Sequence, residues 1–203
     1  MAGRRATPAA PPGFVFRRRA HPSANSILVG GRWPILVDTG FVTAVADRIQ
    51  LVETLRFPHD LGLGVLTHFH SDHAGGAGVL RERFGVPIAL HGIEAVSVNS
   101  RRPDACDVRW LHHPIDPFCV DMALEDGEVL TTGATDLSVV HVPGQTPGHI
   151  ALFSEADRVL ISGDMPWLPP LTADFGPCGR RFARWSASTR WARWSRCPAT
   201  ARS

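Results

Sequence analysis

The 203-residue sequence contains no tyrosine and no lysine, so all of its basic residues are arginine. We attribute this bias to GC-rich coding rather than to function. Its cysteines are few and scattered without CxxC spacing, which excludes both a disulfide framework and a thiolate zinc site. No apolar run approaches the ~20 residues that cross a bilayer, and the N-terminus lacks the apolar segment of a secretory signal. We therefore expect a cytoplasmic protein without a membrane span.

The formal net charge is also small, only +2, because basic and acidic residues nearly balance. The body of the chain thus offers no electrostatic basis for binding nucleic acid or a membrane surface. Hydrophobic residues make up 44% of the sequence, which is ordinary for a protein with a sizeable core. The length fits one domain. A small-molecule substrate is the partner we expect.

Composition divides the chain into three segments. Residues 1–13 are rich in proline and alanine and predict a disordered lead-in. Residues 14–177 form the candidate domain. Residues 178–203 are an atypical tail, and positions 179–203 hold seven arginines, three tryptophans and no acidic residue. Three interpretations are open for the tail: a basic amphipathic helix, an arm that binds nucleic acid or a membrane, or a stretch foreign to the fold after a frame change or early end.

Apolar runs and glycine turns predict an α/β chain. Residues 26–31 and 34–40 indicate a β-hairpin, and the spacing of apolar residues over 42–55 indicates a helix. A strand at 62–66, a helix at 77–84 and a strand at 87–90 follow. Residues 92–120 show no clear period, so we expect irregular structure with at most one helical turn. Four more strands are predicted at 128–130, 137–142, 149–153 and 158–162.

The most informative segment, residues 67–73, reads Thr-His-Phe-His-Ser-Asp-His and follows a buried strand directly. We call it the histidine segment. His68 and His70 stand two apart, so an extended chain presents both imidazoles to the same side, and Asp72 and His73 follow in the turn. Imidazole and carboxylate are ligands of zinc, iron or manganese. The alternative is a surface loop that happens to be rich in histidine.

The sequence resembles the metallo-β-lactamase-fold hydrolases, whose HxHxDH signature stands here at His68–His73. Three further matches follow in order, and the resemblance covers about residues 14–170. These are Leu36-Val-Asp-Thr-Gly40, Pro143-Gly-Gln-Thr-Pro-Gly-His149, which we call the glutamine loop, and Ile161-Ser-Gly-Asp164. The resemblance implies an αββα sandwich, and the glycine-rich stretch after the histidine segment favours the glyoxalase II-like and lactonase-like branch.

By that resemblance His68 and His70 bind a first metal ion, Asp72 and His73 bind a second, and Asp164 bridges the two. The expected cofactor is Zn²⁺, as one or two ions, with iron and manganese as alternatives. A metal-bound hydroxide would attack an ester, thioester or lactone carbonyl, with catalytic Asp72 orienting it.

Asp38 is a further candidate from the same resemblance. It would support the histidine segment without touching a metal. The alternative for Asp38 is a simple turn residue before Gly40.

Two departures from the family pattern bear on activity. Gln145 replaces the usual histidine of the glutamine loop; its carbonyl oxygen would be a weaker ligand, with His149 as a packed or hydrogen-bonding residue or, alternatively, as a substitute ligand. No histidine follows His149, although the family supplies one well downstream of the bridging aspartate to complete the coordination shell of the second ion. We therefore expect the late C-terminal part of the sandwich to be missing, and at most one tightly bound ion. A truncated or decayed family member is the alternative function, and nucleic-acid binding through the tail a third.

Overall fold

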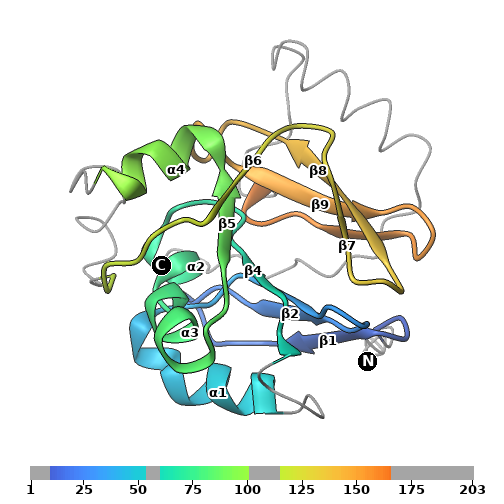
Figure 1. The fold of residues 1–203 in the computed structure, drawn as a ribbon, viewed down its shortest axis with the longest axis horizontal. Coiled ribbons are helices and arrows are strands. Elements are labelled where there is room, and N and C mark those ends of the chain that lie inside the picture. The colour runs from blue at the N-terminus through green and yellow to red at the C-terminus, as the bar shows by residue number, and fades with distance from the viewer. Residues whose placement is uncertain (1–9, 54–59, 101–114, 166–203) are drawn as a thin grey trace, which may run out of the picture.

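The structure is a computed structural model, and it describes residues 10–53, 60–100 and 115–165 (Figure 1). Most of the predicted lead-in, the whole Arg/Trp-rich tail and the C-terminal end of the predicted domain lie outside these residues. The three-segment division therefore stays a prediction.

Six strands form the larger sheet, in the order β1-β2-β3-β4-β5-β6. They are β1 (Phe14–Arg17), β2 (Ser26–Val29), β3 (Ile35–Val37), β4 (Leu63–Val65), β5 (Ile88–His91) and β6 (Met122–Leu124). The first three strands pair antiparallel, and β2 with β3 forms the predicted hairpin, while β3 to β6 run parallel. Parallel neighbours need long crossovers, which place helices on one face of the sheet.

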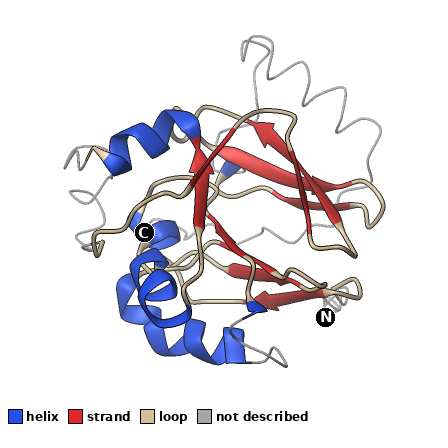
Figure 2. Ribbon diagram, in the orientation of Figure 1, coloured by secondary structure: helices blue, strands red, loops and turns tan. Residues whose placement is uncertain are grey.

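The crossovers hold the helices. A short 3₁₀ turn at Val42–Ala44 leads into α1 (Val45–Glu53), which lies between β3 and β4 in the chain. Helices α2 (Ser71–Ala74) and α3 (Ala77–Phe84) separate β4 from β5, and α4 (Gly92–Asn99) separates β5 from β6. Figure 2 shows these helices gathered at one side of the molecule and the strands at the other.

The smaller sheet has four antiparallel strands in the order β10-β9-β8-β7. They are β7 (Val129–Thr131), β8 (Asp136–His141), β9 (Ile150–Ser154) and β10 (Val159–Ile161). Strand β9 is buried along its whole length, which fits its central place in the sheet. The histidine segment leaves the larger sheet after β4, and Asp164 leaves the smaller sheet after β10.

Two apolar clusters hold the layers together. Leu36 and Leu90 of the larger sheet face the helices and pack with Leu51 of α1. Neighbouring positions on the same strands, such as Val37 and Ala89, face the smaller sheet instead. Alternate residues of a strand point to opposite faces, so the central strands are apolar on both. The described residues thus form three layers, helices on sheet on sheet, as expected of the predicted sandwich.

The sequence prediction was wrong in one stretch. Residues 92–99 form α4, an eight-residue helix, where irregular structure was expected. The helix buries Glu94 together with Ala95 and Val98 and leaves Ile93 and Val96 exposed, so its inner face is not a simple apolar stripe. Strands β1 and β6, the two edges of the larger sheet, are short and only partly buried, and they were not predicted either.

None of the helices found in the described ranges is long and apolar enough to cross a membrane.

Candidate metal centre

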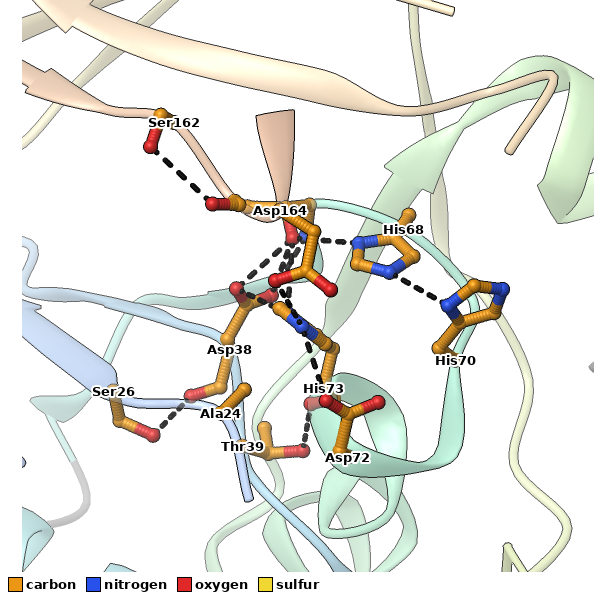
Figure 3. A network of polar contacts seen from close by, with 12 residues as sticks. Ala24, Ser26, Asp38, Thr39, His68, His70, Asp72, His73, Ser162 and Asp164 are labelled. Carbon is orange, nitrogen blue, oxygen red and sulfur yellow. Dashed lines mark hydrogen bonds and ion pairs between the residues drawn. The ribbon is translucent and has the colours of Figure 1, made fainter. Parts of the chain in front are cut away.

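The centre lies where the ends of the two sheets meet. Three side chains, His68, His73 and Asp164, each place one ligand atom within 4.8 Å of the others. His68 and His73 come from the histidine segment, whose last residues form α2, and Asp164 follows β10 ninety-one positions later. Figure 3 shows Asp164 directed at the imidazoles from the opposite side. The structure therefore brings together residues that only the resemblance could connect.

A further carboxylate, Asp72, and a third imidazole, His70, complete the cluster. His73 Nε2 lies 3.2 Å from Asp164 Oδ1 and 3.4 Å from Asp72 Oδ2. His68 Nε2 lies 3.0 Å from His70 Nδ1. Two nitrogens bound at about 2.05 Å to one tetrahedral ion would stand about 3.3 Å apart, close to this separation. The donor set of neutral imidazoles and carboxylates around a buried point fits a divalent cation.

Asp38 supports this arrangement from beneath. Its Oδ1 accepts a hydrogen bond of 2.8 Å from the Thr67 backbone N–H, and its Oδ2 lies 2.8 Å from His73 Nδ1. The Thr67 hydroxyl donates to the same carboxylate. Asp38 is buried and has a left-handed backbone with φ 55°, a conformation that asparagine and aspartate adopt more readily than most residues. The carboxylate thereby holds Nδ1 of His73 and turns Nε2 toward Asp72 and Asp164.

Burial and charge set the protonation of the metal-free centre. Burial, reinforced by His73, lowers the pKa of His68 well below its ordinary value, so its imidazole is neutral. Burial opposes the charge of His73, but Asp38 and Asp164 outweigh it and raise the pKa of His73 well above its ordinary value. Burial raises the pKa of Asp72 to about 6. A proton on His73 thus occupies the position that a cation could take.

His149 is buried beside the centre. Its Nε2 accepts a hydrogen bond of 3.2 Å from the backbone N–H of Asp164, and its ring centroid lies 4.9 Å from that of His68. Burial, with the charge of His73, lowers the pKa of His149 to about 4, so the ring is neutral and can accept. This contact holds the turn that carries Asp164.

Gln145, the predicted weak ligand, is half-buried in the glutamine loop between β8 and β9. The group of His68, His73 and Asp164 forms without it. Its role as a ligand stays a prediction.

Two features of this region were not predicted from the sequence. Thr67 is fully buried, and its hydroxyl lies 3.1 Å from His68 Nδ1 and 3.2 Å from His73 Nδ1. Glu94 of α4 is buried and accepts the backbone N–H of Phe69 at 2.7 Å. An acidic residue within the apolar stretch Gly-Ile-Glu-Ala-Val was the available signal for Glu94.

Comparison with known proteins shows where this arrangement recurs. The model of the metallo-beta-lactamase superfamily matches residues 21–186. A hydroxyacylglutathione hydrolase of Bdellovibrio bacteriovorus is 33% identical over 154 residues, which are 73% of this chain and 51% of that protein. An acyl-coenzyme A thioesterase of Gallus gallus is 26% identical over 187 residues, covering 77% of this chain and 66% of that protein. The chain thus spans about half to two thirds of the length of these relatives.

Solved structures repeat the fold. A metallo-beta-lactamase of Cronobacter sakazakii has a TM-score of 0.59 and 25% identity, covering 70% of this chain and 56% of that chain. A class B3 di-zinc enzyme from a soil metagenome has a TM-score of 0.56 and 20% identity, covering 64% of this chain and 50% of that chain. The family model matches well over half of the sequence and includes the histidine segment, the glutamine loop and Asp164. The chain belongs to the metallo-beta-lactamase superfamily.

Proposed function

We propose that this protein is a metal-dependent hydrolase of activated carbonyl compounds, with thioesters as the first class to test and esters and lactones as the next. The main observation behind this proposal is that His68, His73 and Asp164 converge at a buried point between the sheets. Two relatives, named as a hydroxyacylglutathione hydrolase and an acyl-coenzyme A thioesterase, support the choice of thioesters.

In this proposal the metal ligands are assigned as the resemblance implies. His68 and His70 would hold one divalent ion and Asp72 and His73 a second, with Asp164 able to supply a carboxylate to either. Zn²⁺ is the proposed ion, since imidazole and carboxylate suit it well, and iron or manganese would use the same donors. A bound ion would supply Lewis-acid polarisation of a carbonyl and a water of lowered pKa.

The protein's own groups supply orientation and proton transfer. Asp38 and Thr67 fix the ring nitrogens of His68 and His73, so that the histidine segment keeps its ligand atoms turned inward. The Asp72 side chain is 12% exposed and its Oδ2 lies 3.4 Å from His73 Nε2, where it could orient a water and accept its proton. Burial of His68 and His73 limits competing water.

The test is metal content and hydrolysis in the same preparation. The full chain, reconstituted with Zn²⁺, Fe²⁺ or Mn²⁺, is assayed against a hydroxyacyl thioester of glutathione, an acyl-coenzyme A and a lactone, with ions counted by elemental analysis. We expect hydrolysis that a chelator abolishes, and a loss of roughly 10²–10⁴-fold in Asp72→Asn. Asp136→Asn, at an exposed position of β8, is the matched control.

Each other outcome is informative. Bound metal without hydrolysis of any substrate would favour a family member that has lost its activity. Two tightly bound ions per chain would contradict the prediction that Gln145 and the absent late histidine limit the protein to one.

A further inference from the structure

Glu94 is a buried carboxylate on α4, and it shares the inner face of this helix with the buried residues Ala95 and Val98. It is 6% exposed, whereas Ile93 is 51% and Val96 67% exposed. Burying a charged or polar group is costly unless its hydrogen bonds are satisfied, and burying two apolar residues instead would have been easier. The orientation of α4 therefore calls for a specific role of this side chain.

The two carboxylate oxygens of Glu94 contact two different parts of the centre. Oε2 accepts the Phe69 N–H at 2.7 Å, and Phe69 stands between the predicted ligands His68 and His70. Oε1 accepts the Gly148 N–H at 3.1 Å and the hydroxyl of Thr146, both in the glutamine loop. One side chain thus connects the histidine segment with the glutamine loop, which lie far apart in sequence. We call these hydrogen bonds of Glu94 to Phe69, Thr146 and Gly148 the joint.

The packing leaves this joint little freedom. A Cβ placed on Gly148 would lie 2.7 Å from Glu94 Cγ, so the loop backbone touches the side chain directly. Pro147 lies between the two donors Thr146 and Gly148, and His141 holds it in place. The His141 Nε2 lies 2.9 Å from the Pro147 carbonyl oxygen. Residues 146 to 148 are therefore fixed at three successive positions, next to Gln145.

We propose that Glu94 is a positioning residue that sets the spacing between the histidine segment and the glutamine loop, and thereby how tightly the centre holds a divalent ion. The Ile150 N–H also donates to the Thr67 carbonyl oxygen at 2.8 Å, and Glu94 adds the connection from Phe69 to Thr146 and Gly148. The metal-binding part rests on the proposed function, whereas the joint itself does not.

Glu94→Gln tests the joint with almost unchanged shape. A carboxylate offers an acceptor on each side, but an amide offers only one oxygen, and its NH₂ group must face either Phe69 N–H or Gly148 N–H. One buried backbone donor then loses its partner whichever way the amide turns. Glu82→Gln, at an exposed position of α3, is the matched control.

The first measurement is the Zn²⁺ dissociation constant, obtained by competition with a chromophoric chelator. We expect Glu94→Gln to weaken binding by about 10- to 100-fold, the usual effect of removing a group that orients ligands, and Glu82→Gln to leave it unchanged. A folded Glu94→Gln protein with wild-type Zn²⁺ affinity, even with a lowered melting temperature, would overturn the proposal.

The second measurement needs no metal. Amide hydrogen exchange in the metal-free protein should speed up at Phe69 or Gly148 in Glu94→Gln while amides in β9 keep their protection. Unchanged exchange at both amides would reject the joint. Accelerated exchange in Glu94→Gln, combined with a wild type that binds no ion, would instead keep the joint and reject the proposed function, so the two failures are distinct.

A milder pair of variants covers the case in which Glu94→Gln does not fold. Thr146→Val removes one donor to Glu94 and should raise the Zn²⁺ dissociation constant, with faster exchange at Gly148. Thr146→Ser keeps the hydroxyl and should restore both values. Equal affinities and equal exchange in the two variants would count against the joint.

Discussion

Asp38 links backbone conformation to ligand chemistry at the scale of a single residue. Its carboxylate receives the Thr67 N–H on one oxygen and faces His73 Nδ1 with the other. Because a carboxylate only accepts, the proton of a neutral His73 is held on Nδ1, which leaves the Nε2 lone pair for a cation. The resemblance to the family implies an aspartate at this position, and the geometry gives a physical reason for an acceptor with two oxygens.

Asp38→Asn should weaken metal binding without breaking the fold. Asparagine tolerates the left-handed backbone at φ 55°, but its NH₂ group would face His73 Nδ1 and favour the tautomer with the proton on Nε2. We expect Zn²⁺ affinity to fall about 10- to 100-fold, measured by chelator competition. Asp136→Asn is the control, and an unaltered affinity in Asp38→Asn would show that the tautomer is set elsewhere.

A second prediction concerns His91, which is buried and stacked on His141 with ring centroids 4.1 Å apart. Burial, with the neighbouring His141, lowers the pKa of His91 below its ordinary value. The unfolded chain then binds more protons than the folded one below about pH 6.5, so this histidine removes stability as the pH falls.

His91→Gln should therefore flatten the acid side of the stability curve. The free energy of unfolding, measured with urea between pH 7 and pH 5, should decrease less in this variant than in the wild type. His21→Gln, at an exposed position, should follow the wild-type curve. If both variants lose stability with the wild-type slope, His91 is not a source of the pH dependence.

At the scale of the elements, helices and strands were predicted correctly wherever the local apolar pattern agrees with the packing in the fold. The hairpin of β2 and β3 and the strand pairs of the smaller sheet came from apolar runs broken by glycine or acidic turns. Helix α4 did not, because the residue it turns inward is Glu94, and its partners at Phe69 and Gly148 are known only in three dimensions. Asp164 was placed at the centre by resemblance, since no local pattern relates it to His73.

The turn after β10 shows how an element positions a ligand. Gly163 has φ 52°, and a Cβ there would lie 2.6 Å from His149 Nε2 and 2.9 Å from the Thr67 hydroxyl. Gly85 at the end of α3 has a similar φ of 67°, yet nothing lies within 4 Å of a Cβ at that position. Substitutions at these two glycines therefore separate the cost of backbone strain, which is present at both, from that of a steric clash, which is present only at Gly163.

Gly163→Ala should lower both stability and metal affinity, whereas Gly85→Ala should lower stability alone. Alanine in the left-handed region costs about 1–2 kcal/mol in either variant. At position 163 the clash adds roughly 1–3 kcal/mol and pushes Asp164 away from His73. Urea unfolding and Zn²⁺ titration of both variants check this. Wild-type metal affinity in Gly163→Ala would mean that the turn can move without disturbing Asp164.

At the scale of the whole molecule, the centre spans the two sheets. The histidine segment follows β4 of the larger sheet, and Asp164 follows β10 of the smaller one. Between them the sheets share an apolar core that includes Val37, Val65 and Leu152. An ion held by His68 or His73 together with Asp164 would cross-link the layers at the edge of this core, so metal binding and global stability should be coupled.

Zn²⁺ should therefore raise the melting temperature of the full chain. A ligand that binds only the folded state adds about 2.7 kcal/mol at a concentration of 100 times its dissociation constant. For a protein of this size that corresponds to roughly 5–11 °C, measured by scanning calorimetry against chelator-treated protein. Asp164→Asn should lose most of the shift because it removes the only one of these three ligands that comes from the smaller sheet, and Mg²⁺, which prefers oxygen donors, should produce little. An equal Zn²⁺ shift in wild type and Asp164→Asn would place the stabilising ion within the histidine segment alone, and the two sheets would then fold without a metal bridge between them.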